Sequence, residues 1–182
     1  MLTNRRMCLV LVAALPGLLH AQTGGQAAVP PEVAAEVAGA RLLGKGLLRF
    51  MGLRIYEARL FAAAAGEDWA AAPLALDLQY ARSLDGAKIA ERSLTEMRRL
   101  ADIDNAKSAR WVTAMKQVFP DVKEGDRITG VHVPGMGARF FINGQMKGDI
   151  RDAEFARLFF GIWLSPKTSE PALRDALLGK AS

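Results

Sequence analysis

A β-hairpin is predicted by the stretch Leu42-Leu-Gly-Lys-Gly-Leu-Leu-Arg-Phe50, Met51-Gly52 and Leu53-Arg-Ile-Tyr-Glu-Ala-Arg-Leu-Phe-Ala62. Two apolar-rich runs flank a two-residue turn, which is typical of antiparallel strands that are joined directly. Gly44 and Gly46 lie inside the first run, where glycine indicates a bulge or the close approach of another backbone. Hairpins join antiparallel neighbours, so this stretch predicts an antiparallel sheet.

Further strands follow along the chain. Residues 74–80 alternate between apolar and polar and predict a half-buried strand with one apolar face. Strands are also predicted over 127–133, 138–142 and 145–150. Asn143-Gly144, between the last two, is the strongest hairpin signal, because both central residues of a type I′ turn need positive φ.

Four helices are predicted between and after the strands. They are a helix from its N-cap Asp85 to Leu100, one over 106–118, one capped by Asp152, and a short one capped by Thr168 or Ser169. On the first of them, Arg92, Glu96 and Arg99 are predicted to be solvated. The order of elements predicts an α+β fold, an open-faced β-sandwich with an antiparallel sheet of six or seven strands and a helical layer on one face.

Length and composition limit the function classes. The 182 residues, 51% of them hydrophobic, suit one globular domain and exclude a disordered chain. One Cys and two His exclude an intramolecular disulfide and a Cys/His zinc cluster. Neither a phosphate-binding loop nor a metalloprotease motif is present, so we expect no cofactor and no metal. His132 lies in a predicted strand and is interpreted as structural.

The N-terminus has the pattern of a secretory signal peptide. Arg5 and Arg6 precede an apolar stretch that Pro16 interrupts, and the small residue Ala21 follows. We therefore predict cleavage near Ala21 and a periplasmic or otherwise exported protein, with no integral membrane segment after cleavage.

The predicted domain organisation is a signal peptide over 1–21, a flexible leader over 22–38 and one domain over 39–182. The leader is rich in Gly, Ala, Gln and Pro. The net charge of +5 is spread among acidic residues, so no nucleic-acid partner is expected.

The first hairpin carries the candidate site. With Met51-Gly52 as the turn, Arg49 lies opposite Arg54 and Leu47 opposite Tyr56, so Arg49, Arg54 and Tyr56 are predicted to share one face. Two guanidinium groups and a phenol suit a carboxylate, a phenolate or an enolate. A solvated polar face is the alternative interpretation, and the spacing leaves both open.

The same residues resemble the chalcone isomerase-like family, in particular its exported bacterial branch. The similarity covers about residues 39–179, with its pieces in the family's order. The matching segments are Gly44 to Arg49, Gly52 to Phe61, Leu78 to Arg82, Phe119 to Asp126, Gly135 to Gly148 and Phe155 to Pro166.

This resemblance implies an open-faced β-sandwich and two functional models. The family's plant enzymes cyclise chalcones to flavanones with an Arg on the first hairpin, and Arg49 matches that Arg. The enzymes' strand Thr falls at Tyr56, their Tyr near Asp85 and their Asn near Arg92, so only the Arg is retained. Non-catalytic relatives bind fatty acids through an Arg and a Tyr at the carboxylate and an apolar cleft at the tail.

Three functions therefore stay open from the sequence. The first is an exported protein that binds a small amphipathic anion such as a fatty acid, with Arg49 and Tyr56 at the head group and Arg54 in support. The second is an isomerase, an intramolecular lyase, of unknown substrate. The third is a protein-interaction module without a small ligand, which predicts an exposed apolar patch.

Overall fold

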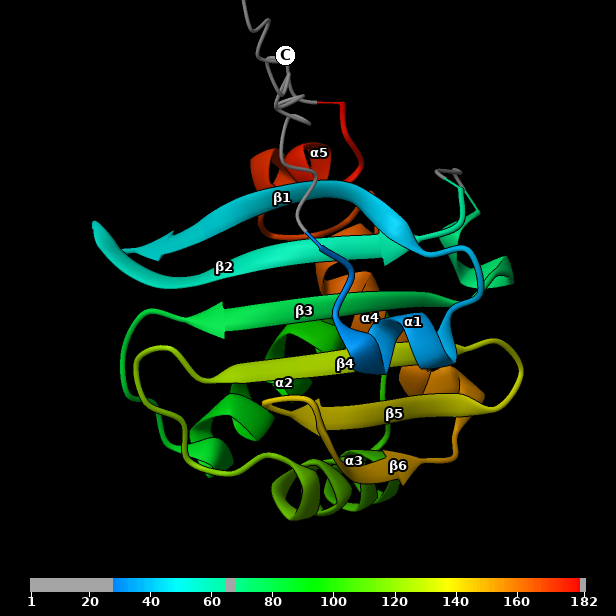
Figure 1. Cartoon of the computed structure of the whole chain (residues 1–182). Helices are drawn as coiled ribbons and strands as arrows, with labels where there is room; N and C mark the ends of the chain where they lie inside the picture. The colour runs from blue at the N-terminus through cyan, green and yellow to red at the C-terminus, as the bar shows by residue number, and fades with distance from the viewer. Residues whose placement is uncertain (1–27, 65–67, 181–182) are drawn as a thin grey trace, which may run out of the picture.

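The computed structural model describes residues 28–64 and 68–180, and the predicted signal peptide lies outside them. An antiparallel sheet of six strands forms the centre of the molecule, and the strands are neighbours in chain order (Figure 1). This confirms the predicted α+β fold. The strands are β1 (Arg41–Phe50), β2 (Leu53–Ala62), β3 (Leu74–Tyr80), β4 (Arg127–Val133), β5 (Gly137–Ile142) and β6 (Gln145–Ile150).

Four helices cover one face of the sheet, and a short helix lies on the other face (Figure 1). The covering helices are α2 (Gly86–Leu100), α3 (Asn105–Val118), α4 (Ala153–Leu164) and α5 (Pro171–Leu177). A 3₁₀ turn, η1 (Trp69–Ala71), precedes β3. None of the helices in the described ranges is long and apolar enough to cross a membrane.

Two of the predicted N-cap residues are confirmed. The Asp85 carboxylate accepts a hydrogen bond from the Lys88 amide, and Asp152 does the same for Phe155, as predicted. The prediction for α5 is wrong by one or two residues. Glu170 is its N-cap, because Pro171 occupies the first helical position, where a missing amide costs nothing.

Helix α1 (Pro31–Glu36) replaces part of the predicted flexible leader. Its Val33 side chain and that of Val37 after it are buried against Phe61 and Val131 on the sheet face opposite the other helices. The composition of residues 22–38 predicts a flexible leader, although these two valines lie one helical turn apart. The helical layer on one face therefore consists of α2 to α5, with α1 on the other face.

Strand β3 is buried on both faces, where the sequence predicts burial on one. Asp77, which belongs to the predicted polar face, lies under α1 with no exposed surface. Its carboxylate accepts hydrogen bonds from Arg59 (2.6 Å to Nη2), Arg127 (2.9 Å to Nε) and Thr129 (2.7 Å to Oγ1). Arg127 also pairs with Glu32 of α1. The charged groups thus satisfy one another, which is how a charge is retained in a buried position.

The β1–β2 hairpin has the predicted turn and an additional bulge. Met51 and Gly52 have φ of 49° and 79°, so the chain reverses in two residues as expected. Arg49 pairs with Arg54, which confirms that part of the register. Tyr56 faces Leu48 and not Leu47, because the register shifts by one residue between these pairs and leaves Ile55 as the extra residue.

Both predicted roles of the glycines in β1 are confirmed. A second register shift lies between Leu42 and Gly44. At Gly44 a Cβ atom would lie 2.1 Å from the carbonyl oxygen of Ala176, and at Gly46 it would lie 2.5 Å from a methyl group of Leu173. Helix α5 therefore packs directly on the backbone of β1.

Candidate functional site

A pocket of about 330 Å³ lies between the sheet and helices α2 and α4, beneath the β1–β2 hairpin. The inner wall of the pocket is largely apolar. Charged side chains from α2 and from the α4–α5 connection also line the pocket. The residues that line the pocket are Leu48, Arg49, Phe50, Ile55, Tyr56, Leu78, Tyr80, Leu84, Asp85, Lys88, Ile89, Arg92, Ser93, Glu96, Phe119, Ile128, Phe159, Ile162, Trp163, Ser169 and Glu170.

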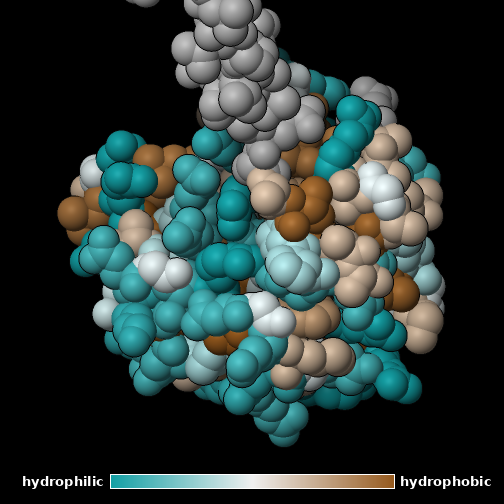
Figure 2. All heavy atoms as spheres, viewed as in Figure 1, coloured by the Kyte–Doolittle hydropathy of each residue, from teal (hydrophilic) through white to brown (hydrophobic). Residues whose placement is uncertain are grey.

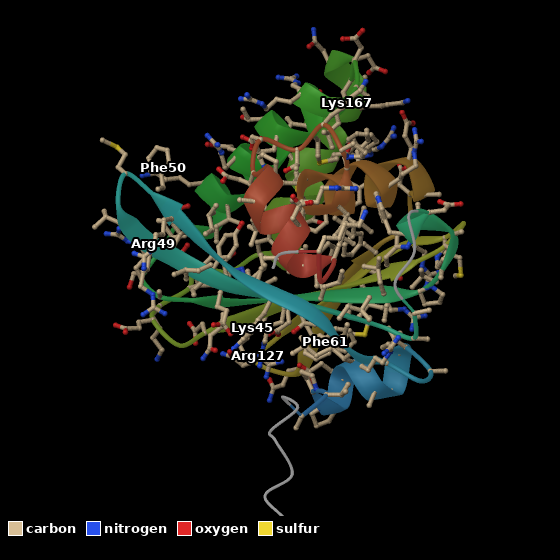
Figure 3. The ribbon with its side chains drawn as sticks, turned by 90° about the horizontal axis from the view of Figure 1, so that it is seen from above. Lys45, Arg49, Phe50, Phe61, Arg127 and Lys167 are labelled. Atoms are coloured by element: carbon tan, nitrogen blue, oxygen red, sulfur yellow. The ribbon has the colours of Figure 1, made fainter. Side chains whose placement is uncertain are left out.

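The hairpin contributes two of the three predicted site residues. Arg49 and Tyr56 both line the pocket, whereas Arg54 is exposed and does not. The extra residue Ile55 breaks the alternation that would have placed Arg54 on the face of Tyr56. Arg49, which is paired with Arg54, still lines the pocket together with its neighbours Leu48 and Phe50. Arg49 lies near the end of the hairpin, as Figure 3 shows. Its Nη1 donates a long hydrogen bond of 3.5 Å to the Gly52 carbonyl oxygen.

Two tyrosines pack together inside the pocket. Their rings meet edge to face, with centroids 5.8 Å apart. The Tyr56 hydroxyl accepts a hydrogen bond of 2.9 Å from Trp163 Nε1, so its own proton stays available to another acceptor. Tyr80 is 3% exposed, and its hydroxyl forms no hydrogen bond with any residue in the described part of the chain.

Burial keeps both phenols protonated. It raises the pKa of Tyr56 well above its ordinary value, and the hydrogen bond from Trp163 opposes only part of that shift. Burial raises the pKa of Tyr80 in the same way, and the neighbouring Tyr56 adds to it. Near neutral pH both hydroxyls are therefore hydrogen-bond donors and not bases.

Helix α2 places a buried carboxylate at the pocket. Glu96 is 6% exposed, so the prediction that it is solvated is wrong. Its Oε1 lies 2.7 Å from Arg92 Nη2, and its Oε2 accepts a hydrogen bond of 2.8 Å from Ser169 Oγ. Glu96 lies seven residues after the apolar residue Ile89, which also lines the pocket, and this helical spacing indicates that both side chains share one face of α2.

Positions assigned through the family resemblance meet in this pocket. Asp85 and Arg92, where the plant enzymes' Tyr and Asn fall, line it together with Arg49 and Tyr56. Asp85 uses its carboxylate to cap α2. These positions thus form one site, although the polar groups of the enzymes are absent from three of them.

His132 is not part of this site. It is 3% exposed and packs against the rings of Trp69 and Phe160, with its Nδ1 3.4 Å from the Ala72 carbonyl oxygen. Burial lowers its pKa, with the contact to Ala72 opposing this shift. The geometry agrees with the structural role expected from the sequence.

Residues 21–179 match the family described as chalcone isomerase-like, and the chain belongs to that family.

Two relatives illustrate the similarity. An uncharacterized protein of Haemophilus influenzae is 30% identical over 108 residues, which are 59% of this chain and 52% of that protein, so the match spans about half the relative's length. The crystal structure of a fatty-acid binding protein of Arabidopsis thaliana has a TM-score of 0.62 and 14% identity, and the alignment covers 83% of this chain and 95% of that one. At this identity the likeness concerns the fold alone.

Proposed function

We propose that this protein binds a small amphipathic anion, such as a fatty acid, in the pocket beneath the β1–β2 hairpin. The observation that carries the proposal is an apolar pocket with Arg49 at its outer part and two phenol donors inside it, Tyr80 buried and Tyr56 partly buried. The fold likeness to a fatty-acid binding protein supports the same class of ligand. The acyl chain would lie on the apolar wall and the carboxylate near Arg49.

The size of the pocket favours a short or medium acyl chain. Small-molecule pockets range from about 300 to 1,000 Å³. At about 330 Å³ this one lies at the lower end. A medium-chain acid would bury its whole tail on Leu78, Phe119 and Phe159, and a longer chain would leave its end in water. Each CH₂ group buried contributes about 0.8 kcal/mol, and an exposed one contributes little.

Arg49 is suited to bind the head group, because its guanidinium forms few contacts within the protein. Its guanidinium is exposed and has only the long contact with Gly52. A carboxylate would offer it a bidentate, charge-assisted partner. Since Arg49 is exposed, water screens this interaction, and we expect it to contribute about 1 kcal/mol, as rim charges do.

Binding is favoured over the alternative of an isomerase. General acid–base catalysis needs a group that exchanges a proton near neutral pH. The two phenols hold their protons, and Glu96 is held by an ion pair with Arg92 and by a hydrogen bond from Ser169 Oγ to its Oε2. The alternative of a module without a small ligand would leave the apolar pocket without a role.

Titration of the purified protein with saturated fatty acids of 8 to 16 carbons tests the proposal. We expect the highest affinity for chains of about 10 carbons. Arg49→Ala should weaken binding about fivefold, and the matched control Arg54→Ala, which removes the paired arginine outside the pocket, should change it less than twofold. Absence of binding throughout the series, together with no lipid extracted from the native protein, would refute the proposal.

Export stays a separate proposal. We infer that residues 1–21 are removed during secretion, as their sequence pattern predicts. N-terminal sequencing of the protein produced in its own host should begin near Gln22, and an intact Met1 in the cytoplasmic fraction would contradict it.

A further inference from the structure

The tip of the β1–β2 hairpin, residues 49–54, extends past the rest of the sheet. Strand β3 pairs with β2 only as far as Tyr56 opposite Tyr80, so the residues of the hairpin tip have no third strand beside them. Figure 1 shows this end of the hairpin projecting beyond the neighbouring strands. Arg49 and Phe50 are seen at the same end in Figure 3.

Exposed apolar side chains concentrate on the hairpin tip. Five large hydrophobic residues are exposed in the described part of the chain, and three of them lie within four consecutive positions. Phe50, Met51 and Leu53 are 59%, 87% and 54% exposed. Figure 2 shows hydrophobic surface at this end of the hairpin. Single exposed apolar residues are ordinary, but a contiguous group marks an interaction site.

Two cations flank the apolar group. Arg49 and Arg54 lie directly across from each other, and neither forms an ion pair with an acidic residue in the described ranges. Lys88 of α2 lines the same pocket as Arg49, where Asp85 is engaged as a helix cap. Apolar side chains between two unpaired arginines are complementary to an interface where acyl chains meet negatively charged phosphates.

We propose that the hairpin tip docks onto an anionic phospholipid surface. Phe50, Met51 and Leu53 enter the interfacial layer, and Arg49 and Arg54 lie at the level of the phosphates. Phe50 also lines the pocket. Docking therefore turns the outer part of the pocket toward the membrane, so that an amphipathic ligand passes between lipid and protein without crossing open water. The docking itself does not depend on the identity of the ligand.

Co-sedimentation of the purified protein with vesicles tests this surface. The vesicles contain phosphatidylglycerol and phosphatidylethanolamine in equal amounts, and a second set contains phosphatidylcholine alone. The variant Met51→Asn with Leu53→Thr removes two apolar groups, neither of which lines the pocket. The matched control is Met136→Asn with Met146→Thr, since both residues are 55% exposed and lie on other hairpins.

We expect wild type to bind anionic vesicles at least fivefold more strongly than phosphatidylcholine vesicles, and 0.5 M NaCl to reduce that difference. The tip variant should lose at least fivefold in vesicle affinity, and the control should stay within twofold of wild type. Leu53→Trp should strengthen binding, because tryptophan prefers the membrane interface, so the test does not depend on losses alone.

Three results would overturn the proposal. They are absence of wild-type binding to anionic vesicles, an equal loss in the control variant, and a concentration-dependent dimer that the tip variant abolishes, which would assign the tip to a second copy of the chain. Fatty-acid titration without vesicles should give the same affinity for wild type and the tip variant. The proposed function and the docking surface can therefore fail independently.

Discussion

Polar side chains on the two faces of the sheet differ in their hydrogen-bond partners. On the α1 side, the buried Asp77 carboxylate accepts hydrogen bonds from Arg59, from Arg127 and from the buried Thr129 hydroxyl. On the side of α2 and α4, the Tyr80 ring is also buried, but its hydroxyl keeps accessible surface at the pocket and forms no hydrogen bond with the described residues. Arg49 at the same pocket has one long contact.

This difference separates polar groups that hold the fold from those that are available to a ligand. A hydroxyl that faces the pocket can be hydrogen-bonded by water in the free protein and by a ligand in the complex, so its removal changes binding more than folding. Removing a polar group on the α1 side should therefore affect stability, and removing one at the pocket should affect binding.

The largest effect is expected from Asp77→Ala. The substitution leaves Arg59 and Arg127 partly buried beside each other without the carboxylate that both contact. Loss of one partner from a buried ion pair costs about 3–5 kcal/mol of unfolding free energy. Urea unfolding measures it, and Asp77→Asn, which keeps the shape, should lose less. A loss below about 1 kcal/mol would show that the α1 side does not depend on this network.

A pair of hydroxyl deletions compares the two faces directly. Thr129→Val removes the donor that lies 2.7 Å from Asp77 Oδ1, and we expect it to cost about 1–2 kcal/mol of stability. Tyr80→Phe removes a hydroxyl that the fold does not use, so stability should change by less than about 0.5 kcal/mol.

For fatty-acid binding we expect the opposite ranking of these two variants. Tyr80→Phe is expected to weaken fatty-acid binding about two- to tenfold, the value of one hydrogen bond, whereas Thr129→Val should leave it unchanged. Equal effects of both variants on stability and on binding would remove the distinction between the two faces.

Much of this fold follows from short-range signals in the sequence. Both predicted hairpin turns, at Met51-Gly52 and Asn143-Gly144, are confirmed, and Asn143-Gly144 has the positive φ angles that its residue types predict. The caps Asp85 and Asp152 are local in the same way. Long-range packing accounts for the errors. Nothing near Asp77 indicates that α1 covers it, and the two valines that hold α1 are hidden among small residues.

The site was predictable in its position and less so in its members. Arg49 and Tyr56 were found from the hairpin and the family resemblance. The bulge at Ile55, which removes Arg54 from the pocket, arises from register and has no signature in residue type. The charge of Glu96 predicts a solvated side chain, although its helical position places it on the inner face of α2. Tyr80 lay on the predicted apolar face, but its unpartnered hydroxyl depends on tertiary contacts.

A smaller effect is expected from the titration of His132 on the pocket side of the sheet. Burial holds its pKa below the unfolded value of about 6.5, so the unfolded state binds more protons just below that pH. Stability should be complete above about pH 6.5 and should fall as the pH drops toward the lowered pKa. Unfolding between pH 7.5 and 5.5 measures this slope, and His132→Phe should flatten it. An unchanged slope in the variant would assign the pH dependence to other groups.

The smallest effect is expected from a second ion pair of α1. Glu36 Oε2 lies 2.6 Å from Arg139 Nη1, but these side chains are more exposed than Glu32 and Arg127 in the neighbouring pair. Partly exposed pairs contribute about 0.2–1 kcal/mol, so Glu36→Gln should stay in that range while Glu32→Gln costs more. In 1 M NaCl, where the screening length is about 3 Å, the Glu36 effect should shrink further than the Glu32 effect. If the two variants lose equal free energy at both salt concentrations, burial beneath α1 does not set the strength of these pairs, and the contrast between the two faces would rest on Asp77 alone.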